Sequence, residues 1–224
     1  MRRFFTFNSL SIVFLVIFLA TLVGQAIAGH DKFNEEEMAH HEPPISLGRY
    51  VTSSSFGQAV MENWQSEYLQ FSLYILGTVW LVQRGSPESK RPDEAGPESD
   101  EDQLLGEHVK PDSPGWAKAG GIRTWVYSNS LILLMGSIFL GTWFADSVCG
   151  WSTFDSDQIT HHQPKVGYLA YLGTSDFWES SLQNWQSEFL AIGSMAIFSV
   201  YLRQRGSPES KPVGAAHEET ATSG

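Results

Sequence analysis

Uncharged apolar runs alternate with polar, acidic stretches along this chain. Two of the runs, residues 10–28 and 126–145, contain no charged side chain and are about twenty residues long. At 1.5 Å per residue, a helix of about twenty residues crosses a hydrocarbon layer of roughly 30 Å. Both runs are therefore predicted to be transmembrane helices.

Two further apolar runs are shorter and become long enough to cross a membrane only when they are extended backward. The resulting helices cover residues 56–82 and 177–202. Aromatic residues stand near both ends of each helix, as is typical of membrane interfaces. These expected interfacial anchors are Trp64, Trp80, Trp185 and Tyr201, and the basic residues that follow them, Arg84 and Arg205. The pattern predicts four transmembrane helices.

The chain contains an internal repeat. Residues 8–90 align without gaps with residues 129–211 at an offset of 121, and 31 of the 83 pairs are identical. The clearest matches are the runs NWQSE, at 63–67 and 184–188, and QRGSPESK, at 83–90 and 204–211. The predicted fold is an all-α integral membrane protein whose four transmembrane helices form two tandem two-helix repeats.

Composition divides the chain into four parts. Residues 1–90 and 122–211 are predicted to be the first and second two-helix membrane units. Residues 91–121 are rich in Pro, Gly, Ser, Asp and Glu, and residues 212–224 have the same character. Such segments cannot bury enough apolar surface to become ordered, so they are predicted to be an acidic flexible cytoplasmic linker and a disordered tail.

The basic residues predict the orientation in the membrane. In a four-helix arrangement only Lys32, Arg49 and Lys165 lie on one side, and the other eleven Lys and Arg residues lie opposite. The positive-inside rule then places both termini in the cytoplasm. A cleaved signal peptide is the alternative for the first helix, because Arg2 and Arg3 precede it and small residues end it.

Charge and cysteine content exclude several classes of protein. The 224 residues carry a formal net charge of −11 and show no basic face, which excludes nucleic-acid binding. Cys149 is the only cysteine, so a disulfide scaffold is excluded. The sequence contains no phosphate-binding glycine loop, HExxH, CxxC or GxSxG motif, so no enzyme activity and no cofactor are expected.

The NWQSE runs contain the strongest candidates for a functional site. Asn63 and Glu67 are four residues apart and share one helix face, as do Asn184 and Glu188. A glutamate near hydrocarbon is costly, so it is a functional candidate by default. We expect the two pairs to meet as a polar intramembrane cluster that joins helices, and a proton or cation pathway is the alternative.

Four histidines occur as two adjacent pairs at equivalent positions, His40 with His41 and His161 with His162. Imidazole binds zinc or copper, but neighbouring side chains in an extended segment point to opposite faces. Exposed loop residues are therefore the favoured interpretation, and a metal site is the alternative.

The QRGSPESK runs are explained in part as helix ends. Glycine supplies a left-handed cap, proline prevents continuation, and arginine meets lipid phosphates. The identity extends to Lys90 and Lys211, beyond the needs of a cap, which leaves a partner-binding epitope open.

The apolar helix, the outer loop with a proline and a tyrosine, NWQSE and the QRGSPESK exit together resemble a family of small duplicated bacterial membrane proteins classed as a domain of unknown function. The resemblance implies four membrane helices and no activity. We expect a structural or interaction protein whose partners are the lipid bilayer and a second copy or another membrane protein. A small channel or transporter and a metal-binding sensor or enzyme are the alternatives.

Overall fold

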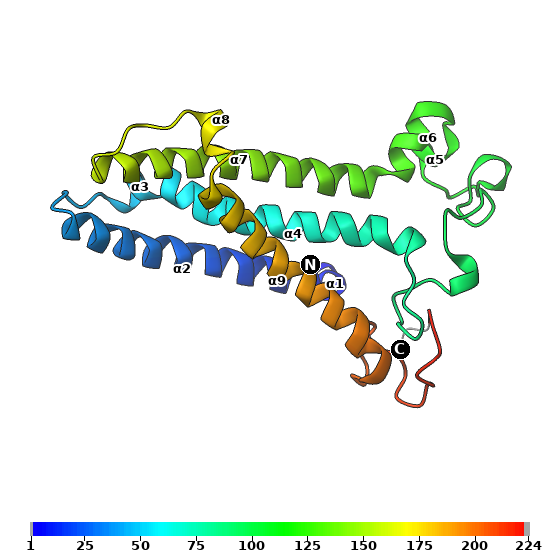
Figure 1. The fold of residues 1–224 in the computed structure, drawn as a ribbon. Coiled ribbons are helices and arrows are strands. Elements are labelled where there is room, and N and C mark those ends of the chain that lie inside the picture. The colour runs from blue at the N-terminus through cyan, green and yellow to red at the C-terminus, as the bar shows by residue number, and fades with distance from the viewer. Residues whose placement is uncertain (1, 222–224) are drawn as a thin grey trace. The chain divides into compact units, whose positions relative to one another are not determined.

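A computed structural model describes residues 2–221, and every regular element among them is a helix, which confirms the all-α prediction. The four long helices are α2 (Ser9–Ala39), α4 (Ser54–Trp80), α7 (Ser130–Thr160) and α9 (Ser175–Tyr201) (Figure 1). The shorter helices are α1 (Arg2–Phe7), α3 (Leu47–Tyr50), η1 (Pro92–Glu94), η2 (Gly106–His108), α5 (Gly115–Lys118), α6 (Gly121–Ser128) and α8 (Tyr168–Tyr171).

The sequence repeat reappears in the bounds of the helices. Each of α7, α8 and α9 begins and ends 121 residues after α2, α3 and α4, respectively. The two copies therefore place their helix ends at equivalent residues, although about three fifths of their aligned positions differ.

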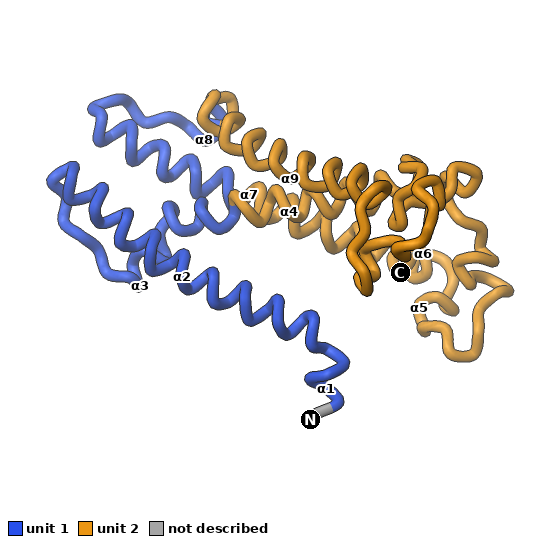
Figure 2. The backbone as a smooth tube through the Cα atoms, turned by 90° about the horizontal axis from the view of Figure 1, so that it is seen from below, with its two compact units in different colours: residues 1–61, 145–171 blue, residues 62–144, 172–224 orange. Residues whose placement is uncertain are grey.

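The chain divides into two compact units that do not coincide with the two repeats. Unit 1 comprises residues 1–61 and 145–171, and unit 2 comprises residues 62–144 and 172–224 (Figure 2). Each unit takes residues from both copies, and α4 and α7 run from one unit into the other. The boundaries at residues 90, 121 and 211 stay predictions.

Two helices, α2 and α7, are long and apolar enough to cross a membrane, each with 31 residues. The 27-residue helices α4 and α9 are long enough but not apolar enough to be identified as membrane spans, since their N-terminal halves carry Asn, Gln and Glu. Two membrane-length helices are thus found in the part of the chain described, and four spans remain a proposal.

Both membrane-length helices continue past the apolar runs that predicted them. The apolar runs end at residues 28 and 145, but α2 reaches Ala39 and α7 reaches Thr160. Side chains of these extensions bind the connecting segment that follows. Asn34 Oδ1 accepts a hydrogen bond from the Ile45 amide at 2.8 Å, and Asp155 Oδ1 accepts one from the Val166 amide at 2.8 Å.

A second bond to the same connecting segments is made by two different residue types. His30 Nε2 lies 2.7 Å from the Ile45 carbonyl oxygen, and Trp151 Nε1 donates to the Val166 carbonyl at 2.7 Å. His30 and Trp151 are equivalent in the repeat. A ring nitrogen therefore lies against the equivalent backbone oxygen in both copies. The contact holds each connecting segment against the helix that precedes it.

A buried tyrosine packs against a helix glycine in each copy. Tyr50 is 5% exposed and Tyr171 is 2% exposed. A Cβ added to Gly29 would lie 2.3 Å from Tyr50 Oη, and one added to Gly150 would lie 2.4 Å from Tyr171 Oη. Only glycine allows the phenol to approach so closely, so this pair fixes where α3 and α8 lie against the preceding helices.

Replacing Gly29 by alanine should lower the free energy of unfolding by about 1–3 kcal/mol, because the new methyl group overlaps the Tyr50 hydroxyl. Thermal unfolding in detergent measures the loss. Gly24→Ala is the matched control, since a Cβ there meets nothing within 4 Å and alanine favours helix. Adding Tyr50→Phe to Gly29→Ala should restore part of the loss, and equal stability of the Gly29 and Gly24 variants would contradict the packing argument.

Candidate functional site

Polar side chains join α4 to α9 within unit 2. Glu62 Oε1 accepts hydrogen bonds from Ser180 Oγ at 2.6 Å and from Asn184 Nδ2 at 2.9 Å. Gln65 Oε1 accepts one from Trp185 Nε1 at 2.7 Å, and Gln65 is completely buried. We call these five residues the polar seam. Each bond runs from a residue of the first copy to a residue of the second.

The seam includes one of the four residues expected to form a polar cluster. Asn184 lies in it, but its partner is Glu62, which immediately precedes NWQSE and was not singled out from the sequence. Asn63 and Glu67 are exposed on α4. Glu67 lies within electrostatic range of Glu188, so the two helices bring these carboxylates near one another.

The predicted interfacial aromatic residues have different surroundings. Trp185 packs against Trp143 with ring centroids 5.6 Å apart, and it donates to the seam. Trp64 is half-buried, whereas Trp80 and Tyr201, at the C-terminal ends of α4 and α9, are exposed. Their role as membrane anchors stays a prediction.

The QRGSPESK runs form two loops of the same conformation, the first exit loop (83–90) and the second exit loop (204–211). The amide of Gln83 donates to Ser89 Oγ at 2.8 Å, and that of Gln204 donates to Ser210 Oγ at 2.9 Å. Both glycines are left-handed, with φ of 87° at Gly85 and 83° at the equivalent residue, Gly206. Glycine is required there, because other residues are strained at such angles.

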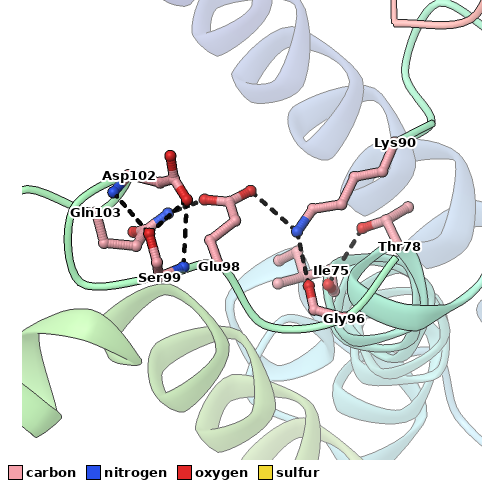
Figure 3. A network of polar contacts seen from close by, with 8 residues as sticks. All are labelled: Ile75, Thr78, Lys90, Gly96, Glu98, Ser99, Asp102 and Gln103. Carbon is pink, nitrogen blue, oxygen red and sulfur yellow. Dashed lines mark hydrogen bonds and ion pairs between the residues drawn. The ribbon is translucent and has the colours of Figure 1, made fainter. Parts of the chain in front are cut away.

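The last lysine of each exit loop holds the chain that follows it. Lys90 Nζ lies 2.9 Å from the Gly96 carbonyl and 2.9 Å from Glu98 Oε1 (Figure 3). This hydrogen-bonded ion pair, with a further hydrogen bond from Gln103, lowers the pKa of Glu98. This contact gives a structural reason for the identity of the two copies to extend as far as the lysine. The role of the lysine could not be assigned from the sequence.

Lys211 makes the corresponding contact in the second copy and is 1% exposed. Its Nζ donates to the carbonyls of Ala216, His217 and Glu219 at 3.1, 2.9 and 3.2 Å. Burial, with a contribution from the charge of Arg203, lowers the pKa of Lys211. The ammonium group therefore organises the start of the tail by satisfying three backbone oxygens.

The tail then reaches the first exit loop. Arg84 Nη2 lies 2.6 Å from Glu218 Oε2, the Gly85 amide donates to Thr220 Oγ1 at 2.9 Å, and the Ala221 amide donates to a carbonyl of the loop at 3.1 Å. A Cβ at Gly85 would lie 2.2 Å from the carbonyl oxygen of His217. Tail and loop thus fit together through backbone atoms. Arg205, the repeat counterpart of Arg84, is exposed.

A cavity of about 410 Å³ lies between α4, α9 and the first exit loop. Tyr74 and Glu88 line it, and Tyr74 Oη donates to Glu88 Oε2 at 2.5 Å. The hydrogen bond between Glu209 and Glu88, together with the negative charge of Glu88, raises the pKa of Glu209. The two glutamates are equivalent in the repeat, so the two exit loops meet at Glu88, which lines the cavity.

Residues 1–222 match the family described as Domain of unknown function (DUF6766). The chain belongs to this family. No curated protein and no solved structure matches the sequence. Membership in DUF6766 indicates no activity, and it does not bear on the repeat or on the membrane.

The paired histidines of this DUF6766 chain lie at helix ends. His41, with φ of 66°, follows the end of α2, and His162, with φ of 57°, follows the end of α7. Both side chains and those of His40 and His161 are exposed. Among the described residues, no group of three or more His, Cys, Asp or Glu side chains is placed to hold a metal ion.

Replacing Lys211 by methionine should release the tail of the DUF6766 chain, because three backbone oxygens lose a charged donor. Amide hydrogen exchange over residues 215–221 should rise by about ten- to a hundredfold, as expected from roughly 1.5–3 kcal/mol per charged hydrogen bond. Arg205→Met is the control, since this side chain is exposed. Unchanged exchange in the Lys211 variant would show that the lysine does not hold the tail.

Proposed function

We propose that this protein is a four-span membrane protein of the bacterial inner membrane, with both termini in the cytoplasm. The apolar stretch of α2 supports a membrane location, since none of its residues is buried within the protein. Such a surface is unfavourable in water and is covered by lipid tails in a bilayer. The distribution of basic residues supports the orientation.

The role that the geometry supports best is a structural or interaction protein built around the polar seam. The single observation that carries this proposal is the set of hydrogen bonds that Glu62 and Gln65 accept from α9. Between helices in lipid, hydrogen bonds and close packing replace the hydrophobic effect as the source of association. The lipid bilayer is one partner, and a second copy or another membrane protein is the other.

The number of spans can be tested with single cysteines in a Cys149→Ser background, which is otherwise free of cysteine. Cysteines at Glu42 and Gln163 should react with an impermeant maleimide in intact cells. Cysteines at Glu101 and Gly214 should react only after lysis. If α2 and α7 alone cross the membrane, positions 101 and 163 exchange sides, so this labelling pattern would overturn the four-span proposal.

The seam can be tested by a double-mutant cycle of Glu62→Leu and Asn184→Leu, measured by unfolding in bicelles. The coupling energy should be about 0.5–2 kcal/mol, the range for interhelical hydrogen bonds in membranes. Glu67→Leu combined with Asn184→Leu is the matched control and should show coupling near zero, since Glu67 is exposed. Additive effects of the Glu62 and Asn184 variants would contradict a role for the seam in joining the helices.

A further inference from the structure

The 410 Å³ cavity has an apolar body. Its walls come from the C-terminal half of α4, from α9 and from the first exit loop. The main apolar side chains are Leu73, Leu81, Val82, Phe189, Ile192 and Ala196. Pockets for small organic ligands have about 300–1,000 Å³ and are lined mostly by apolar and aromatic residues. The cavity has the size and the lining of such a pocket.

One end of the cavity is acidic. Among the described residues that line it, Glu88 alone carries a formal charge, and its carboxylate accepts the hydrogen bond from Tyr74. Glu209 adds a second carboxyl group by its hydrogen bond with Glu88. The nearest basic side chains of the first exit loop are engaged elsewhere, Lys90 with Glu98 and Arg84 with Glu218. The end of the cavity is therefore suited to a positive charge.

A second cavity, of about 300 Å³, lies on the other side of the same hydrogen bond. Tyr74, Glu88 and Ile192 line both cavities, and Phe71 and Met195 complete the apolar part of the second. The Tyr74–Glu88 pair thus stands between two apolar spaces. A ligand whose charge contacts Glu88 can place apolar groups on either side of it.

We propose that this site binds a lipophilic monocation, a molecule with an apolar body and one ammonium- or phosphonium-type charge held at Glu88. Charge complementarity selects this class, since the single negative charge that Glu88 shares with Glu209 would repel phosphate or carboxylate headgroups. The rings of Tyr74 and Phe189 line the cavity and favour a cation over a neutral ligand.

The Tyr74–Glu88 pair has no counterpart in the second copy. Met195 stands at the repeat position of Tyr74, so the second copy has no phenol to orient Glu209. All lining residues belong to unit 2, and the site does not depend on the number of membrane spans. The inference therefore goes beyond the structural role proposed above and can fail independently of it.

Equilibrium dialysis of the purified full-length protein in detergent tests the proposal, with tetraphenylphosphonium as the probe. Binding should be saturable, with about one probe per chain. Tetraphenylborate, which has a similar shape and the opposite charge, should show no saturable binding.

Glu88→Gln should weaken tetraphenylphosphonium binding by about tenfold or more, as expected for the loss of one charge contact. Glutamine still offers Tyr74 an acceptor, and Glu101→Gln in the linker should bind as the wild type does.

A second variant separates loss of binding from loss of fold. Gly193 lines the cavity, and a Cβ there meets nothing within 4 Å, so Gly193→Leu places its side chain in the space without a change in charge. It should abolish binding at unchanged thermal stability. The proposal is overturned by absence of saturable binding to the wild type, by equal binding of tetraphenylborate, or by wild-type affinity in both the Glu88 and Gly193 variants.

Discussion

Hydrogen bonds from helix side chains to the backbone of the connecting segments hold this fold together. Few apolar side chains are buried in the part of the chain that the structure describes. The long helices supply Val60, Phe177 and Val200, and the short helices α3 and α8 supply Tyr50 and Tyr171. In a bilayer, apolar helix faces gain no hydrophobic free energy by packing on one another, so they do not select a particular neighbour. Directional polar contacts must therefore determine which segment lies against which helix. Asn34, Asp155 and the two exit-loop lysines all supply such contacts.

The repeat shows which of these contacts are needed in each copy and which are needed once. Where a copy folds on itself, the bond is kept even when the residue changes, as with His30 and Trp151. Where the copies meet within unit 2, the contacts are unequal, although Gln65, Asn184 and Trp185 belong to the identical NWQSE runs. Glu62 faces Asn184, whereas the repeat position of Glu62 holds Gln183. The seam and the cavity therefore need residues of both copies, and the second copy has no equivalent of Glu62 or Tyr74.

The sequence was sufficient to predict whatever depends on local pattern. Apolar runs predicted the long helices, the constant offset predicted equivalent helix bounds, and Gly85 predicted a left-handed helix exit. Contacts between distant residues could not be predicted. The first apolar run ends at residue 28, yet α2 continues to Ala39, and Asn34 on this extension accepts a hydrogen bond from Ile45, eleven residues later. Glu62 and Glu88 were missed for the same reason, since their partners are 122 and 121 residues away.

The first exit loop connects features that the sequence presents as separate. Ser86 is 4% exposed and lines the 410 Å³ cavity. Its carbonyl oxygen accepts a hydrogen bond from the amide of Ala221 in the tail. The tail in turn is held by Lys211 of the second exit loop. One short loop therefore fixes the wall of the cavity on one side and the tail on the other. Because backbone atoms make most of these contacts, the loop cannot move toward the cavity without breaking its bonds to the tail.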